Sequence, residues 1–478
     1  MSAGARTRRA AALCALALAL AAGCALQGTP AWKEPPPPVR TGPVVDATRL
    51  HRAELANGLE IVVFEDTRLP ELALGLAVRR GAAQERLEQA GLATFTAELV
   101  TRGAGTRDAL ALAKVVDDLG ATLDATADWD SMRVVTTGLS RDADTLFGVL
   151  ADVVRRPRFE RSEAGKVQRE LLAVLEQQKD NPAILARNAL ARALYDGHRF
   201  GAPLSGTQAA VARLDAAAAA AFHRALFVPG NAILFATGDV SFPDVLARAQ
   251  AAFGDWPAGP TPELPASPPS PAPPARRMVI VDRPDLVQAQ IAIGHDGMAR
   301  TDPARIPALL MNEILGGGGF TSRLMARVRA EAGLTYGANS WFAMRRAPGP
   351  FVVGTFTRVA ETRRTIDLVL SEVERTAREP LAPEELAAAQ RLAAGSFALG
   401  LETAADVTEA VVDLDVQRLP ADSLDTYRAR VLAATLDDVQ RAARERLHPE
   451  RAAIVVVGPA QELVPALDGL GPIEVTRP

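Results

Sequence analysis

The first half of the chain separates short apolar runs from longer segments with helical spacing. Residues 59–65 and 72–78 are predicted as strands, and residues 121–127 and 132–139 as a strand pair. Helices are predicted at residues 91–103, 108–119, 144–155, 162–179 and 183–195. Because strands and helices come in separate runs, the pattern predicts an α+β fold with helices packed on one face of a largely antiparallel sheet.

The same order of elements returns in the second half. A helix opens at Leu214, and a turn after it leads into the strand 232–238. A helix that opens at Leu436 is likewise followed by a turn and the strand 452–458. The two copies lie about 220 residues apart, which indicates duplication of a whole domain rather than a short repeat.

Proline-rich stretches divide the chain into domains. Residues 257–276 contain almost no large apolar side chain and are predicted as a polyproline-type linker. The predicted organisation is a leader at 1–23, a proline-rich tether at 24–47, an N-terminal domain at 48–256, the linker at 257–276 and a C-terminal domain at 277–478.

The composition is that of a globular protein. The chain has 478 residues, 48% of them hydrophobic and 23% charged, and its net charge is −4. This length exceeds what one core usually supports, so at least two domains are expected. No basic stripe indicates nucleic acid as a partner, and the acidity is too mild to identify another one.

The first residues are predicted to be a targeting signal. Arginines precede the apolar run 10–22, which is too short to span a bilayer but suits a secretory signal. The run ends in Leu-Ala-Ala-Gly-Cys24, which resembles a bacterial lipobox. The resemblance implies that Cys24 is acylated, and Ala25 after it points to the outer membrane. The alternative is a free Cys24 after a plain signal peptide.

Cysteine usage fits this interpretation. Cys14 and Cys24 are the only cysteines, and Cys14 lies in the segment that would be removed. If Cys24 is lipidated, the folded protein has no thiol. This excludes a disulfide, a cysteine nucleophile and a thiolate metal site.

The most unusual stretch of the second half is a run of four glycines: Gly316, Gly317, Gly318 and Gly319. Glycine loses the most backbone entropy on folding, so such a run is predicted as a loop where the backbone bends sharply or approaches another chain. Apolar residues at helical spacing over 324–332 then predict a short helix that ends at Gly333.

This stretch resembles a known peptidase family. After the glycines come Ser-Arg-Leu and then R-x-E-x-G-L-x-Y, from Arg329 to Tyr336. The order resembles the C-terminal half of the pitrilysin/insulinase family of zinc metallopeptidases. The resemblance implies two α+β domains that form half of a clamshell, a substrate-binding glycine segment, and an Arg329 and Tyr336 that reach into the peptidase cavity. An ordinary loop and helix, with a surface Arg and a half-buried Tyr, is the structural alternative.

Catalytic members of that family carry H-x-x-E-H on a helix of the first half. Its two histidines bind zinc, its glutamate is the general base, and a later glutamate is the third ligand. Here the matching positions are held by residues of other types: Thr94, Ala97, Glu98 and, for the third ligand, Val174. We therefore expect no metal and no cofactor in this chain. Thr94 and Glu98 share a helix face and are predicted as a polar lining.

Other chemistries find no support in the sequence. The five histidines are spread so that no two fall within one helical turn. His198 and His448 are predicted as surface or capping residues. No G-x-S-x-G turn occurs, and the glycine run is not followed by Lys-Ser/Thr, so a phosphate-binding loop is excluded.

The first hypothesis is a non-catalytic subunit of a heteromeric periplasmic zinc endopeptidase, because two-subunit members of the family divide labour in this way. The partner would carry H-x-x-E-H and the zinc. Arg329 would hold the backbone of a peptide substrate, and Tyr336 would donate a hydrogen bond to the oxyanion. The second hypothesis is a pseudoenzyme that binds peptides or assembles with envelope proteins. A self-sufficient peptidase with unrecognised ligands is the third.

Overall fold

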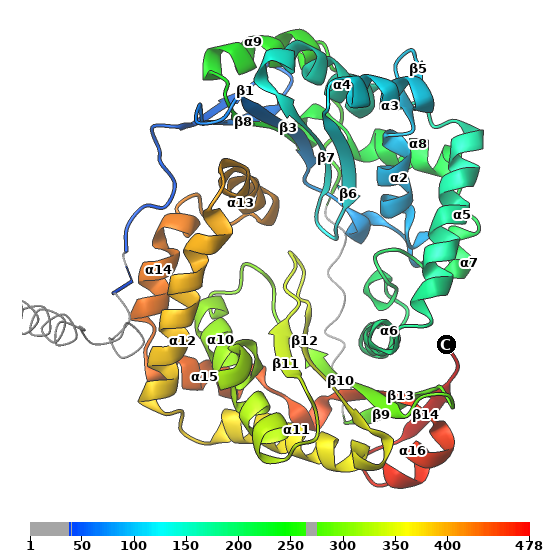
Figure 1. The fold of residues 1–478 in the computed structure, drawn as a ribbon, viewed down its shortest axis with the longest axis vertical. Coiled ribbons are helices and arrows are strands. Elements are labelled where there is room, and N and C mark those ends of the chain that lie inside the picture. The colour runs from blue at the N-terminus through cyan, green and yellow to red at the C-terminus, as the bar shows by residue number, and fades with distance from the viewer. Residues whose placement is uncertain (1–37, 40, 264–274) are drawn as a thin grey trace, which may run out of the picture. The chain divides into compact units, whose positions relative to one another are not determined.

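The computed structural model describes residues 38–39, 41–263 and 275–478, which form two mixed β-sheets with helices packed on them (Figure 1). Everything from Thr41 onward belongs to one compact unit. We call residues up to 263 the first half and those from 275 the second half. Cys24 and the leader lie outside the described residues. The predicted α+β architecture, repeated in two halves, is confirmed.

Each half contains one six-stranded sheet. The first has the order β1 (Leu50–Glu54), β2 (Glu60–Glu65), β8 (Ala232–Gly238), β3 (Glu71–Val78), β7 (Met132–Leu139) and β6 (Thr122–Ala127). The second has the order β11 (Ala338–Phe342), β12 (Pro350–Arg358), β10 (Gln288–Asp296), β13 (Ala453–Gly458), β9 (Arg277–Asp282) and β14 (Ile473–Thr476). Most neighbours are antiparallel. The parallel pairs are β2 with β8, β13 with β9 and β14 with β9.

The helices follow the predicted periodicity closely. Those of the first half are α2 (Leu92–Val100), α3 (Ala109–Asp118), α4 (Ala143–Arg155), α5 (Arg161–Gln178), α6 (Pro182–Leu194), α7 (Gln208–Val211), α8 (Ala216–Leu226) and α9 (Phe242–Phe253). Those of the second half are α10 (Arg305–Asn312), α11 (Thr362–Arg378), α12 (Pro383–Ser396), α13 (Ala404–Gln417), α14 (Ser423–Ala433), α15 (Leu436–Arg446) and α16 (Ala460–Ala466). The helix predicted at 91–103 stops at Val100, because Gly103 has a φ of 110° and opens the short strand pair β4 (Gly103–Ala104) and β5 (Arg107–Asp108). Among the described residues, no helix is both long and apolar enough to cross a bilayer.

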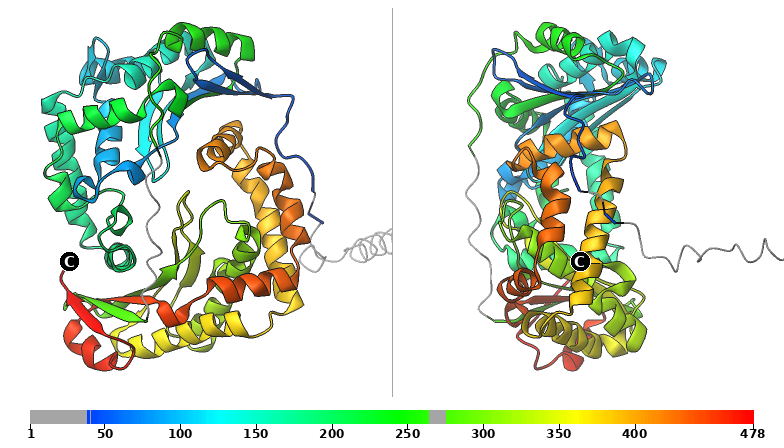
Figure 2. Two further views of the ribbon diagram at one scale, coloured as in Figure 1. Left: turned by 180° about the vertical axis from the view of Figure 1, so that it is seen from behind. Right: turned by 90° about the vertical axis from the view of Figure 1, so that its left-hand side faces the viewer.

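The two halves exchange one helix each (Figures 1 and 2). In the duplicated order of elements, α6 of the first half corresponds to α13 of the second. Helix α6 packs on β10 and β13 of the second sheet, whereas α13 packs on β2 and β8 of the first. Each sheet is therefore covered on both faces, and the prediction of helices on one face only is wrong. Burial on both faces explains why β2 and β8 are apolar at nearly every position.

The duplication also preserves the contacts of one glutamine side chain in each half. Gln168 on α5 and Gln390 on α12 occupy equivalent positions, and each donates its side-chain amide to three carbonyl groups of a turn that precedes a helix. The acceptors are Val211, Ala212 and Leu214 for Gln168, and Val431, Leu432 and Ala434 for Gln390, at 2.9 to 3.2 Å. Such a shared arrangement supports a common origin of the two halves.

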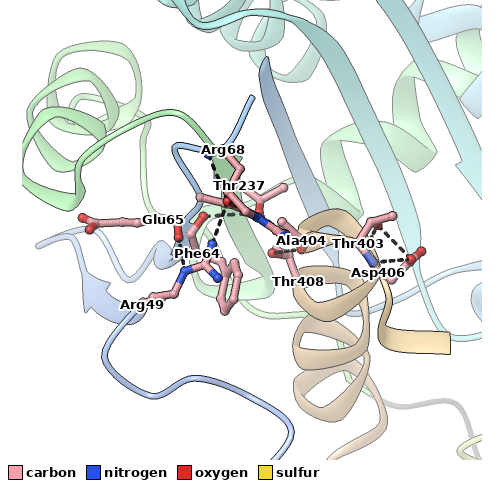
Figure 3. A network of polar contacts seen from close by, with 10 residues as sticks. Arg49, Phe64, Glu65, Arg68, Thr237, Thr403, Ala404, Asp406 and Thr408 are labelled. Atoms are coloured by element: carbon pink, nitrogen blue, oxygen red, sulfur yellow. Dashed lines mark hydrogen bonds and ion pairs between the residues drawn. The ribbon is translucent and has the colours of Figure 1, made fainter. Parts of the chain in front are cut away.

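The start of α13 is fixed on the first sheet (Figure 3). The Thr403 side chain accepts from the backbone N–H of Asp406, whose carboxylate accepts from the backbone N–H of Thr403. This reciprocal cap satisfies two free N–H groups at the helix start. Next to it, the Thr237 hydroxyl on β8 lies 3.3 Å from the carbonyl oxygen of Ala404 and 3.2 Å from that of Phe64. The exchanged helix thus begins at a point that the first sheet defines.

The end of α13 is strained. Arg418 closes the helix in the left-handed conformation, with φ 55° and ψ 41°. Its guanidinium also lies close enough to repel two other arginines. Burial lowers the pKa of Arg80 to about 10, and repulsion from Arg346 and Arg418 adds to the effect. A side chain at this position costs stability that glycine would not.

Arg418→Gly is therefore expected to raise the free energy of unfolding by about 1 kcal/mol. Urea unfolding of the full chain measures the change. Arg391→Gly is the matched control, because Arg391 is exposed in the interior of α12, where the same replacement should lower stability by about 1 kcal/mol. If both replacements lowered the free energy of unfolding, the backbone of Arg418 would not be strained.

Candidate functional site

The glycine run is only partly a loop. Helix α10 continues into a wide π-helical turn, η7 (Glu313–Gly317), and a 3-10 turn, η8 (Gly319–Thr321), follows. Gly316 lies against β11, where a Cβ atom would come within 2.5 Å of the Ser340 hydroxyl. Gly319 has a φ of 62°. The loop prediction is wrong for Gly316 and Gly317, which belong to the helical turn because the neighbouring strand leaves no room for a side chain.

The helix predicted after the glycines is present in a wider form. Its π-helical segment, η9, covers Met325–Glu331. Gly333, with a φ of 63°, ends it, as predicted, and Leu334 N–H then bonds back to the carbonyl of Val328. π-Helical turns are rare in proteins and frequent at functional sites. Here one of them contains the first two glycines of the run, and the other follows the run after a short 3-10 turn.

The three arginines of this segment differ in their partners. Arg323 forms two hydrogen bonds of 2.7 Å with the Glu385 carboxylate, and Arg327 pairs with Glu331 at 2.6 Å. The guanidinium carbon of Arg329 instead lies 4.5 Å from the centre of the Phe320 ring. Arg329 has no carboxylate partner in the part of the chain that the structure describes. It is the arginine of this segment that is available to a ligand.

Tyr336 combines an exposed side chain with a fixed backbone. The residue is 79% exposed, which is far more than the half-buried Tyr of the structural alternative. Beside it, the carbonyl oxygen of Gly337 accepts hydrogen bonds from the hydroxyls of Thr335 at 3.0 Å and Thr355 at 2.8 Å. The hydroxyl of Thr357 bonds to the carbonyl oxygen of Leu334 at 2.8 Å. Three hydroxyls thus hold the backbone around Tyr336.

Exposed aromatic side chains gather in the same segment. Within the described ranges, the large exposed aromatics are Phe320 at 75%, Tyr336 at 79% and Trp341 at 39%. Trp341 belongs to β11, which is an edge strand of the second sheet. Exposed aromatic rings, one of them beside Arg329, suit a peptide, which offers both apolar side chains and backbone carbonyls.

The degenerate zinc positions lie on α2 and α5, which pack together. Thr94 is half-buried, and its hydroxyl donates to the carbonyl oxygen of Leu204 at 3.2 Å. Ala97 is buried, whereas Glu98 and Val174 are exposed. A loop of the same half thus binds the hydroxyl of Thr94, and the polar lining formed with Glu98 stays a prediction. One carboxylate, a hydroxyl and two apolar side chains do not fit zinc.

A buried ion pair fixes the start of helix α2. The Glu85 carboxylate accepts from Gly91 N–H at 2.9 Å, from Ala93 N–H at 2.6 Å and from Arg199 Nε at 2.5 Å. Burial raises the pKa of Glu85, while Arg199 opposes this shift. Arg199 also donates to the loop that binds Thr94, through the carbonyls of Ala202 and Pro203. Across the described residues, no three His, Cys, Asp or Glu side chains come together as metal ligands.

The two histidines predicted as caps do cap turns. His198 Nδ1 accepts from Phe200 N–H at 3.2 Å, and His448 Nε2 donates to the carbonyl oxygen of Glu445 at 3.1 Å. Sequence reasoning missed Phe320, Trp341 and the threonines of β12. The available signals were an aromatic residue directly after the glycines and hydroxyls that alternate along a strand.

Comparison with known proteins decides the family. Residues 61–208 match the model described as insulinase (peptidase family M16), and residues 213–392 match the peptidase M16 inactive domain. The chain belongs to peptidase family M16. An uncharacterized zinc protease of Streptomyces coelicolor is 25% identical to this M16 protein, over 86% of this chain and 90% of its own length. The uncharacterized zinc protease YmxG of Bacillus subtilis is 21% identical, over 74% of this chain and 85% of its own.

Solved structures agree with this assignment. A peptidase M16 inactive domain from Pseudomonas fluorescens matches with a TM-score of 0.78 and 28% identity, over 86% of this chain and 98% of its own. A protease from Helicobacter pylori has the same TM-score at 18% identity, which shows the fold alone. The resemblance inferred from the sequence is confirmed. With Thr94, Ala97 and Glu98 in place of H-x-x-E-H, this protein is an inactive M16 homologue.

Proposed function

We propose that this M16 protein is the non-catalytic subunit of a heteromeric zinc endopeptidase. The observation that supports it most directly is that one short segment carries both an Arg329 without a carboxylate partner among the described residues and an exposed Tyr336 on a fixed backbone. Both side chains would serve chemistry that the first half of the same chain cannot perform, because its zinc positions are Thr94, Ala97, Glu98 and Val174. A second M16 chain with H-x-x-E-H would supply the zinc and the general base.

In this proposal each side chain has a separate task. Arg329 donates to backbone carbonyls of the bound peptide, and the adjacent ring of Phe320 keeps its guanidinium plane in place. Tyr336 donates its hydroxyl proton to the scissile carbonyl oxygen as negative charge develops there. The glycine segment 316–319 brings backbone close to the substrate. We further propose that Cys24 anchors the protein in the outer membrane, so that the peptidase works in the periplasm.

A peptide-binding pseudoenzyme is the competing function, and the exposed rings of Phe320 and Trp341 favour it equally. Affinity isolation of the full-length protein from its own envelope in mild detergent separates the two. A co-purifying chain in comparable amount, with H-x-x-E-H and bound zinc, supports the peptidase subunit. Recovery of the protein alone, without metal, supports the pseudoenzyme.

Arg329→Ala is expected to raise the KM of the assembled peptidase by roughly 10- to 150-fold with little change in kcat, because a charged hydrogen bond to the substrate backbone is worth about 1.5–3 kcal/mol in ground and transition state alike. Steady-state kinetics on an unstructured peptide give both constants. Arg327→Ala is the control, since Arg327 is exposed and already paired with Glu331. Equal effects of the two replacements would contradict a specific role for Arg329.

A further inference from the structure

The segment that carries Tyr336 continues into a hairpin whose outer strand, β11, is an edge strand. Strands β11 and β12 pair from Ala338 with Thr355 to Phe342 with Phe351. Strand β11 forms the edge of its sheet, so β12 is its only strand neighbour among the described residues. Tyr336 lies two residues before β11. The position of Tyr336 therefore depends on how β11 is fixed, in addition to the three threonine hydroxyls that hold its own backbone.

The middle of β11 is fixed within the second half. The Asn312 side-chain amide donates to the carbonyl oxygen of Ser340 at 3.0 Å, and the Ser340 hydroxyl donates back to Asn312 Oδ1 at 2.7 Å. Both groups are buried. This pair joins α10 and the glycine turn to the middle of β11, but it does not reach the tip of the hairpin at residues 343–349.

The tip is held within the second half by Arg300 N–H, which donates to the carbonyl oxygen of Arg345 at 2.7 Å, and by Gly349 N–H, which donates to that of Met298 at 3.1 Å. It is also held by the first half, through an aromatic cage around Arg345. The guanidinium carbon of Arg345 lies 4.3 Å from the ring centre of Trp129, 4.3 Å from that of Phe200 and 5.9 Å from that of Tyr195. No carboxylate of the described chain forms an ion pair with Arg345. A desolvated cation against ring faces is a directional contact, so the cage fixes where the tip lies.

The next residue adds three hydrogen-bonded contacts. Arg346 N–H donates to Asp130 Oδ2 at 2.8 Å, its Nη1 donates to the carbonyl oxygen of Arg79 at 3.1 Å, and its Nη2 donates to the carbonyl of Val416 at the end of α13. Trp129 and Asp130 belong to the turn between β6 and β7. The tip therefore contacts the turn between β6 and β7, the backbone of Arg79 directly after β3, and the end of the exchanged helix α13.

We propose that Arg345 is a positioning residue for Tyr336. The contacts of its guanidinium with the rings of Trp129, Phe200 and Tyr195 help to fix β11 and thereby the backbone that carries Tyr336. The first half, which lost its zinc ligands, would then keep a supporting task for the second. The loop that carries Phe200 is ordered by the pair Arg199 and Glu85, and Arg199 itself lies 4.8 Å from the Trp129 ring. The catalytic part of this inference rests on the proposed function.

Hydrogen exchange of the amides of residues 338–342 in the full chain tests the physical part. Arg345→Met keeps the length of the side chain and removes the cation, and exchange is expected to become at least tenfold faster. Trp129→Leu should have a similar effect, and the double variant should add little, because both changes break the same contact. Arg345→Lys should restore part of the protection. Arg358→Met is the control, because Arg358 lies at the far end of β12 and its side chain is 70% exposed. Unchanged exchange in Arg345→Met would overturn the inference.

Kinetics with the zinc-bearing partner test the catalytic part. Arg345→Met is expected to lower kcat about tenfold while KM changes less than twofold, because a displaced donor weakens the transition state more than the ground state. If Tyr336→Phe lowers turnover and Arg345→Met does not, the positioning role is overturned and the proposed function stands. If Tyr336→Phe leaves turnover unchanged, the proposed function fails. The hydrogen-exchange rates of the β11 amides then decide by themselves whether the aromatic cage positions β11.

Discussion

Removal of the Tyr336 hydroxyl is expected to reduce the turnover of the assembled peptidase by about 100-fold, because an oxyanion donor typically contributes roughly 3 kcal/mol to transition-state stabilisation. Tyr336→Phe deletes one oxygen atom from a side chain that is 79% exposed. The surrounding backbone is held by the hydroxyls of Thr335, Thr355 and Thr357, which the replacement leaves in place. Folding and assembly should therefore be unaffected.

The measurement is kcat at saturating peptide, together with the amount of partner that co-purifies. Tyr427→Phe is a matched control, because Tyr427 lies half-buried on α14 against Phe397 and outside the 316–341 segment. It should leave turnover unchanged. Wild-type turnover in Tyr336→Phe would remove Tyr336 from the mechanism, whatever the partner proves to be.

The second large effect is a loss of folding stability in acid. Burial lowers the pKa of both His223 and His295 from 6.5 to about 4. In the unfolded chain each would titrate near 6.5, so the unfolded state binds more protons between these values. The contribution of these two histidines to the free energy of unfolding is therefore fully present above about pH 6.5. It falls as the pH drops towards 4 and levels off below that. Each histidine accounts for a loss of about 3 kcal/mol, and a typical domain has only 5–15 kcal/mol in total.

The surroundings of His295 explain why its neutral form is preferred. Its Nδ1 donates to the carbonyl oxygen of Asp296 at 2.6 Å, and its Nε2 accepts from the backbone N–H of His448 at 3.1 Å. A proton on Nε2 would face another N–H group. Urea unfolding at several pH values should show the loss, and His295→Gln should remove about half of the slope between pH 6.5 and 4. An identical slope in that variant would contradict the assignment.

Local periodicity was sufficient to predict most elements. The strand pair 121–127 and 132–139 was placed almost to the residue, because alternating side chains flank a short polar turn. The exchange of α6 and α13 could not be predicted, since the apolar face of a helix does not reveal which sheet will cover it. The amphipathic pattern of α6 is equally compatible with either sheet.

The candidate site was predictable in its residues but not in its contacts. Arg323, Arg327 and Arg329 look alike in the sequence, and only the structure separates two paired arginines from the one that lies on Phe320. Nothing in the sequence marked Arg345 as a contact residue, because the three rings around it come from the distant residues 129, 195 and 200. Contacts between distant segments are set by the fold, and no local pattern records them.

The exchanged helices also determine when the protein can finish folding during synthesis. Strands β2 and β8 leave the ribosome long before α13, and at typical rates of 5–20 residues per second the delay after β8 is roughly 10 to 35 s. Throughout that interval Val62, Phe64 and Phe235 have no helix to cover them. The nascent first half must remain incomplete and in need of protection from aggregation until nearly the whole chain has been made.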